Sequence, residues 1–182
     1  MEGELMVKRK ELKFAHEDAV LLGFIGYIES NGGHIEVVDK PDPPEAIVKI
    51  NGKKTWIEVT DAFLDRRHAI SLTSCSSEDV EDQPDDRRMI IEPDAIFRSQ
   101  LVSVISKKYE KKSMIKIKDE LGGGILLVGV FTPFNTARGI VQEENKTIEE
   151  LIQSKSCKVF NEIYVYDGTG AREYCRIYPL CS

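Results

Sequence analysis

The dipeptide Asn51-Gly52 constrains the fold of this chain more than any other feature. It lies between two strand-like runs, EAIVKI and KKTWIEVT. Both central positions of a two-residue hairpin turn need a positive φ, which Asn and Gly adopt more readily than other residues. We therefore expect an antiparallel hairpin over residues 45–60.

The hairpin turn also determines which side chains face each other. Counting outward from the turn places Trp56 opposite Ile47, and Glu58 opposite Glu45. Side chains alternate between the two faces of a strand. One face is therefore expected to carry Glu45, Ile47, Trp56, Glu58 and Thr60, and the other face Ala46, Val48, Ile57 and Val59.

Two glutamates facing each other on a sheet need a compensating group. Directly opposed residues have Cβ atoms about 4.5–5.5 Å apart, and like charges placed so are destabilising. A shared proton, a bridging lysine or arginine, or a divalent cation would remove the repulsion. Mg²⁺ is typically held by one or two carboxylates together with water. The alternative is a register shifted by one residue, or a solvated sheet face, which leaves the two acids without a role.

The rest of the chain alternates helical and strand-like patterns. Apolar spacing predicts a helix from about His16 to Ser30 and another from about Asp94 or Ala95 to Lys112. HIEVVDK, GGGILLVGVF, EIYVYDG and REYCRIYPL are typical of strands, and Thr147 with Glu150 forms a capping box for a third helix. This order predicts the α/β class, with a central mixed β-sheet flanked by helices.

Length and composition narrow the protein class. The 182 residues predict one domain, with a polar, acidic excursion at about residues 65–93 that is either a solvated loop or a lid over a site. The net charge of −6 argues against a wholly basic nucleic-acid binder but not against a local basic surface.

The longest apolar run, residues 124–131, is too short to cross a bilayer, so no membrane partner is expected. The first residues lack the apolar core of a secretory signal, and the four cysteines form no CxxC pair, so we expect reduced thiols and a cytoplasmic protein without structural zinc.

The run PPEAIVKINGKKTWIEVT resembles the core motif of the PD-(D/E)xK nuclease superfamily, the restriction-endonuclease-like fold. In that motif an acidic residue follows a proline at the start of one strand, and the next strand carries an acid, any residue and a lysine. Here Glu45 follows Pro44, and Glu58-Val59-Thr60 stands in the second place. The leading helix with Glu17, and the later helix followed by GGGILLVGVF, match the order of the family core. The resemblance covers about residues 15–62 and 95–132.

This resemblance implies a nuclease-like domain over residues 1–182 that hydrolyses DNA phosphodiesters with Mg²⁺ or Mn²⁺. It assigns Glu45 and Glu58 as metal ligands, with the Val59 carbonyl completing the shell and Glu17 touching it through water. The alternative for Glu17 is a first-turn acid favoured by the helix dipole. A homodimer is expected as well, because cutting both DNA strands takes two active sites.

Two positions depart from the family motif. Glu stands at position 45, where the family usually has Asp, and Asp42 competes for that role. Asp42 would point to the opposite face of a continuous strand, although the prolines that follow it can break this alternation. The second departure is Thr60, which stands in place of the motif lysine and carries no charge.

Some family members recruit a basic or amide side chain from the following helix when this lysine is absent. Lys108 is the first candidate, because it borders the apolar face of that helix, three residues after Ile105 and seven after Leu101. Gln100 and Lys107 are weaker candidates, and each of the three has a solvated helix position as its alternative. We expect Glu45, Glu58, Thr60 and Lys108 to form the catalytic centre.

Lysines are concentrated at the end of this helix and just after it. Lys107, Lys111 and Lys112 are expected to contact the DNA backbone, which would make affinity salt-sensitive and largely independent of sequence. The alternative is an ordinary solvated helix end, favoured by the C-terminal dipole. The complete set is Lys107, Lys108, Lys111, Lys112, Lys116 and Lys118.

Three functions therefore remain open from the sequence. The first is a metal-dependent deoxyribonuclease. The second, motivated by Thr60, is a catalytically inactive nuclease-fold protein that binds nucleic acid or a protein partner. The third is an unrelated α/β domain in which Glu45 and Glu58 face each other by coincidence.

Overall fold

The computed structural model describes residues 9–64, 69, 91–168 and 172–179. Most of the acidic excursion expected over residues 65–93 lies outside this part of the chain. The elements are α1 (Arg9–Ser30), β1 (Ile35–Asp39), β2 (Ala46–Ile50), β3 (Lys53–Phe63), α3 (Pro93–Glu110), α4 (Lys112–Leu121), β4 (Gly124–Phe131), α5 (Ala137–Ser154), β5 (Phe160–Asp167) and β6 (Tyr174–Tyr178).

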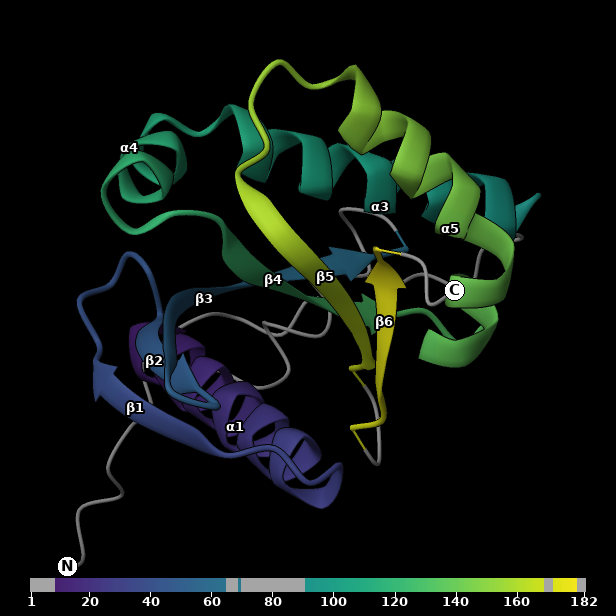
Figure 1. Ribbon diagram of the computed structural model, residues 1–182. Helices are drawn as coiled ribbons and strands as arrows, with labels where there is room; N and C mark the ends of the chain where they lie inside the picture. Colours follow the sequence, from purple (N-terminus) through teal and green to yellow (C-terminus); the bar gives the residue numbers. More distant parts are fainter. Residues whose placement is uncertain (1–8, 65–68, 70–90, 169–171, 180–182) are drawn as a thin grey trace, which may run out of the picture.

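The strands form one mixed six-stranded sheet in the order β1-β2-β3-β4-β5-β6. The pairs β1–β2, β2–β3 and β5–β6 are antiparallel, whereas β3, β4 and β5 run parallel. Helix α1 lies on one face of the sheet, and α3 and α5 lie on the other (Figure 1). This arrangement confirms the predicted α/β class with a mixed sheet flanked by helices.

The predicted hairpin is confirmed. Asn51 and Gly52 have φ values of 50° and 80°, and Ile47 pairs with Trp56. The β2–β3 ladder ends at Ala46 and Ile57, whereas β3 continues to Phe63 beside β4. Beyond Ile57, β3 therefore has an edge that β2 does not cover.

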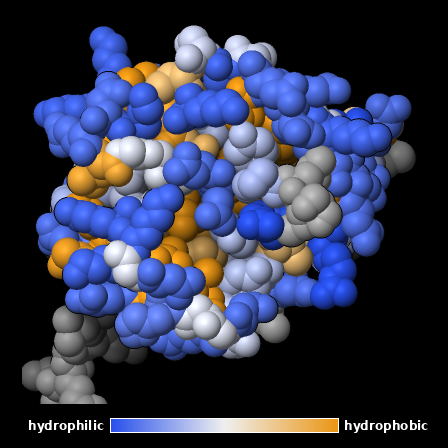
Figure 2. Space-filling view, viewed as in Figure 1, coloured by the Kyte–Doolittle hydropathy of each residue, from blue (hydrophilic) through white to orange (hydrophobic). Residues whose placement is uncertain are grey.

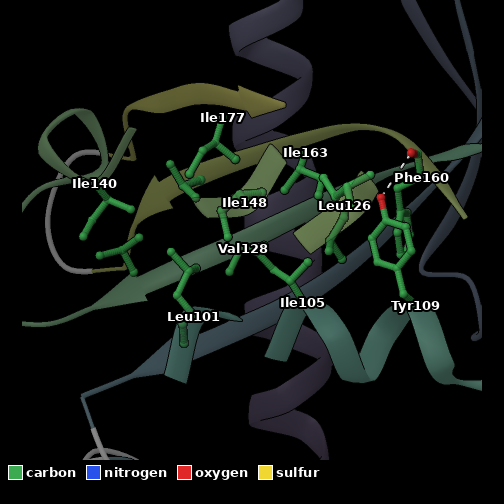
Figure 3. Packing of buried hydrophobic residues seen from close by; sticks show 14 of the residues in the cluster. Leu101, Ile105, Tyr109, Leu126, Val128, Ile140, Ile148, Phe160, Ile163 and Ile177 are labelled. Atoms are coloured by element: carbon green, nitrogen blue, oxygen red, sulfur yellow. Dashed lines mark hydrogen bonds between the residues drawn. The ribbon is translucent and has the colours of Figure 1, made fainter. Parts of the chain in front are cut away.

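Each face of the sheet has its own apolar core. Figure 3 shows the core beneath α3 and α5, where Leu101 and Ile105 pack with Leu126, Val128 and Ile163. The second core joins Val20, Leu21 and Phe24 of α1 to the other side of the same strands. At about 25 cal/mol per Å² of buried apolar surface, these two layers are the main source of stability.

Trp56 shows how closely the first core is packed. A Cβ atom on Gly124 would lie 2.4 Å from the indole ring, so β4 needs a glycine where Trp56 crosses it. The indole Nε1 donates a 2.8 Å hydrogen bond to the carbonyl of Gly122. The β2–β3 hairpin is thereby attached to the segment between α4 and β4.

Two regions of helix differ from what the sequence predicts. Helix α1 already includes Arg9 instead of beginning at about His16. Residues 9–15 are good helix formers, but they carry no apolar periodicity from which a helix would be predicted. The second expected helix is confirmed as α3, which ends at Glu110. Helix α4 was not predicted, and Lys111, with an extended backbone (φ −69°, ψ 117°), separates the two helices.

The expected start of the third helix is wrong. Helix α5 begins at Ala137, and its N-cap is Thr136, whose hydroxyl accepts a hydrogen bond from Gly139 N at 3.2 Å. Thr147 lies inside the helix, so it caps nothing. The buried stripe of α5 includes Glu144, and this charge interrupts the apolar pattern from which a helix is predicted.

The surface view in Figure 2 shows polar side chains over most of the visible face, with apolar side chains between them. None of the helices described has the length and apolarity needed to cross a membrane.

Candidate functional site

A hollow of about 340 Å³ opens beside the uncovered edge of β3. Its floor is β3 from Glu58 to Asp61. Lys108 and Lys111 contribute from the end of α3, and the loop before β2 contributes Glu45. Residues of α1 complete its lining. The site therefore lies where the two helical layers meet the open edge of the sheet.

Glu45 and Glu58 come together as the hairpin register predicts. Glu45 directly precedes β2, and its Oε2 accepts a 3.1 Å hydrogen bond from the backbone N–H of Val59. Glu58 is 1% exposed, and its Oε2 is buried without a hydrogen-bond partner among the described residues. A proton on Glu45, or a cation between the acids, would satisfy that oxygen.

The electrostatics of Glu45 follow from this crowding. Burial is the main cause that raises the pKa of the Glu45 carboxyl to about 9; contact with Glu58 and the charge of Glu58 act in the same direction, and Lys108 opposes them. Two carboxylates this close disfavour each other's ionisation, and Lys108 offsets only part of this effect. The raised pKa of Glu45 therefore favours a proton held by the pair in the metal-free protein.

Lys108 supplies a positive charge to the same point. Its Nζ lies 2.5 Å from Glu58 Oε1 and 3.0 Å from the Val59 carbonyl oxygen, and its side chain is 17% exposed. Lys111 Nζ lies 3.7 Å from the same Glu58 oxygen. Lys108 thus stands beside the acids, where Thr60 of the motif brings no charge. Gln100 and Lys107, the weaker candidates, are not among the residues that line the hollow.

Glu17 and the Val59 carbonyl, the other two groups that the resemblance implies, each contact a lysine in this structure. Glu17 lines the hollow, but its Oε1 pairs with Lys13 Nζ at 3.1 Å. The Val59 carbonyl is occupied by Lys108. Within the described ranges, no three His, Cys, Asp or Glu side chains gather closely enough to hold a metal ion. The donor set for a cation is therefore the pair Glu45 and Glu58, a set that suits Mg²⁺ with water completing its shell.

Asp42 lies closer to the site than strand alternation suggests. Strand β2 begins only at Ala46, so the alternation of faces does not extend back to position 42. Asp42 is exposed and lines the same hollow as Glu45. It remains the alternative acid, but Glu45 is the one hydrogen-bonded to β3.

The three lysines expected to contact DNA are only partly gathered. Lys111 lines the hollow, whereas Lys107 and Lys112 are exposed on the neighbouring ends of α3 and α4. The break at Lys111 separates the two helices, so these side chains do not follow one continuous helix face.

Sequence reasoning missed a second group at the same hollow, formed by His16, Asp61 and Tyr166. Asp61 accepts a 2.9 Å hydrogen bond from the Tyr166 hydroxyl, and His16 Nε2 lies 3.2 Å from an Asp61 oxygen. One signal was present: His16 lies four residues before Val20 and eight before Phe24, which places it on the buried stripe of α1.

Comparison of the chain with family models, curated proteins and solved structures finds no match in any of the three. The hollow beside β3 is the feature of the molecule that bears on its function.

Proposed function

We propose that this protein is a metal-dependent nuclease of the PD-(D/E)xK type that hydrolyses DNA phosphodiesters. The observation that carries the proposal is the meeting of Glu45, Glu58 and Lys108 in one hollow at the open edge of the sheet. A buried pair of acids is unfavourable unless something is gained from it, and a bound cation supplies that gain.

Glu45 and Glu58 would hold Mg²⁺ or Mn²⁺ between them. The unpartnered Oε2 of Glu58 and the proton held on Glu45 support this assignment, since a cation would satisfy the first and displace the second. A bound divalent cation lowers the pKa of an attacking water and offsets the charge of the phosphate. Glu58 keeps its orientation through Lys108, and Glu45 through the Val59 N–H.

Lys108 would take the role of the missing motif lysine. Its ammonium group is held by two acceptors, Glu58 and the Val59 carbonyl, so it is already in place before a substrate arrives. A preorganised positive charge next to the phosphate stabilises the charge that develops in the transition state. Thr60, which follows Val59 on β3, lines the same hollow and carries no charge.

Nucleic acid fits the surroundings of the hollow. Lys111 lines it, and Lys107 and Lys112 are exposed nearby, so a DNA backbone crossing the site would meet several positive charges. One such site cuts one strand. A homodimer that cuts both strands remains an expectation from the family resemblance.

The test is nicking of a supercoiled plasmid by the full chain with Mg²⁺ or Mn²⁺. We expect the wild type to nick the plasmid, and Glu45→Gln and Lys108→Met to lose activity by about 10²-fold or more, as for loss of a catalytic charge. A chain with no cation-dependent activity, or variants as active as the wild type, would overturn the proposal.

The same samples separate the second candidate function, a binding module without catalysis. That alternative is favoured by Thr60, since the motif lysine is absent from its usual position. It predicts salt-sensitive DNA binding in fluorescence anisotropy together with no hydrolysis.

A further inference from the structure

The cluster of His16, Asp61 and Tyr166 lies on the α1 side of the same hollow. His16 comes from α1, Asp61 from β3 and Tyr166 from β5. Tyr166 OH donates to Asp61 Oδ1 at 2.9 Å, and His16 Nε2 lies 3.3 Å from both atoms. Side chains from three separate elements thus meet at one carboxylate.

The register of strands β3, β4 and β5 brings Asp61 and Tyr166 into contact. Asp61 pairs with Gly129 of β4, and Gly129 pairs with Tyr166 of β5. A Cβ atom on Gly129 would lie 2.4 Å from Asp61 Oδ1 and 2.7 Å from the Tyr166 hydroxyl. The missing side chain on the middle strand lets the two outer side chains hydrogen-bond across it.

The three side chains of this cluster differ in how much of their surface is exposed to solvent. The His16 side chain is 28% exposed, Asp61 is 23% exposed and Tyr166 is fully buried. Asp61 and Tyr166 therefore hold the imidazole, while His16 faces the hollow. Because Nε2 is engaged by Asp61, Nδ1 is the nitrogen left to address a ligand.

The hollow consequently has two chemically different sides. Successive residues of β3 alternate between faces, so Glu58 points toward α3 and Lys108, whereas Asp61 points toward α1 and His16. In hydrolysis of a phosphodiester the attacking and leaving oxygens lie on opposite sides of phosphorus. A phosphate at the edge of β3 can thus be attacked from the Lys108 side and lose its leaving group toward His16.

We propose that His16 is the general acid of this hydrolysis and protonates the leaving oxygen. The inference depends on the proposed function. The water oxygen forms the new bond to phosphorus, and the bond from phosphorus to the leaving oxygen breaks with its electron pair on that oxygen. His16 Nδ1 gives its proton to that oxygen, and the attacking water gives its proton to solvent. Asp61 and Tyr166 are positioning residues, because they act through His16.

The charges around His16 suit this task. The hydrogen bond to Asp61 raises the pKa of the imidazole above its usual value, and burial opposes the shift. The charges of Asp61 and Glu17 also raise this pKa, and the charge of Arg172 lowers it. Burial raises the pKa of the Tyr166 hydroxyl, which therefore keeps its proton and remains a donor to Asp61. An acid with a pKa near the working pH is the most effective proton donor.

The first experiment needs no activity. NMR titration of the His16 ring in the metal-free full chain should show a midpoint above that of an unperturbed histidine. In Asp61→Asn the midpoint should fall by about one pH unit, because the opposite charge is removed. An unchanged midpoint in Asp61→Asn would overturn the arrangement on which the proposal depends.

The second experiment is turnover on a DNA strand in which one linkage is cleavable. His16→Gln should lower kcat by about 10²-fold, the usual contribution of a general acid. DNA affinity measured with Ca²⁺ should be unchanged, and the loss of rate seen for the wild type above the His16 pKa should be absent. In Asp61→Asn that loss should begin at a lower pH.

Sulfur in place of the leaving oxygen provides the decisive control. A thiolate leaves without prior protonation at neutral pH, since thiols have pKa values of about 8.5. His16→Gln should therefore cleave the sulfur-containing strand almost as fast as the wild type, whereas Lys108→Met should remain slow on both strands. Equal losses for His16→Gln on the two strands would overturn the general-acid role.

The two proposals fail in different ways. If the wild type shows no cation-dependent cleavage, the proposed function and the role of His16 both fail. If the wild type cleaves DNA and His16→Gln retains its rate and pH profile, only the role of His16 fails. Asp61→Asn serves as the second variant should His16→Gln not fold, which thermal unfolding would show.

Discussion

Glu58 and Glu144 are buried glutamates with similar immediate contacts and different surroundings. Glu58 Oε1 lies 2.5 Å from Lys108 Nζ, and Glu144 Oε1 lies 2.5 Å from Arg98 Nε. Both carboxylates leave their Oε2 buried and without a partner in the described part of the chain. By burial and pairing alone, the two could not be told apart.

Their surroundings differ in two respects. Glu58 faces a second acid, Glu45, and opens onto a hollow. Glu144 belongs to the buried stripe of α5, with its partner Arg98 half exposed on α3, and it does not line the hollow. A buried ion pair by itself is weak evidence of anything beyond local structure. The second carboxylate and the open space make Glu58 the candidate for chemistry.

The largest expected difference between the two glutamates is in activity. Glu58→Gln should lower cation-dependent plasmid nicking by about 10³-fold, because a ligand to the cation is lost. Glu144→Gln, the same change at similar burial, should nick at the wild-type rate. Equal activity of the two variants would remove the functional distinction between these sites.

The next effect is the pH dependence of stability in the absence of metal. Between pH 4.5 and about 9 the folded protein keeps a proton on Glu45 that the unfolded chain has released. Stability should therefore be fully present at low pH and decline as pH rises, with a slope of at most about 1.4 kcal/mol per pH unit.

Urea denaturation from pH 5 to 9 measures this slope. Glu45→Gln should flatten it, leaving a smaller decline near neutral pH from His16, whose pKa is also raised. Glu144→Gln should keep the wild-type slope. A wild type whose stability rises over this range would contradict the proton held by the acidic pair.

A third expectation concerns stability at fixed pH. Glu144→Gln should lower the free energy of unfolding by about 1–3 kcal/mol, because a buried charge-assisted hydrogen bond is lost. Glu58→Gln loses a similar contact with Lys108, but it also removes the charge that helps to keep a proton on Glu45, so its loss of metal-free stability should be the smaller of the two. Chemical denaturation of both variants at pH 8 makes the comparison, and the opposite ranking would argue against the acidic repulsion.

The smallest effect is stabilisation by divalent cations. At a free concentration ten times its dissociation constant, Mg²⁺ or Mn²⁺ should add about 1.4 kcal/mol to the free energy of unfolding. For a chain of this size that raises Tm by about 3–6 °C. The shift should persist in Glu144→Gln and vanish in Glu58→Gln. Thermal unfolding with Na⁺ at matched ionic strength controls for general salt effects.

Much of the group formed by Glu45, Glu58 and Lys108 could be predicted from local sequence. The Asn51-Gly52 turn sets the register that brings Glu45 to Glu58, and the apolar spacing of Leu101 and Ile105 places Lys108 at the border of its helix. These predictions succeeded because a two-residue turn and a helix repeat each determine geometry within a few residues. The chemical roles of these side chains remain predictions for experiment.

Other features could not be inferred in this way. The start of α5 was missed because Glu144 interrupts its buried stripe, and the ion pair of Glu144 with Arg98, on another helix, makes that burial tolerable. The break between α3 and α4 at Lys111 carries no glycine or proline as a signal. Both outcomes depend on contacts between elements far apart in the sequence.

Local backbone preferences and a period of two were enough to specify the strand–turn–strand unit and the faces on which its acids lie. The meeting of His16, Asp61 and Tyr166 beside them came from long-range packing. Their contact spans 150 residues and requires β4 to lie between β3 and β5 with Gly129 at the crossing point. Local preferences do not set such contacts, since the order and packing of the strands bring them about.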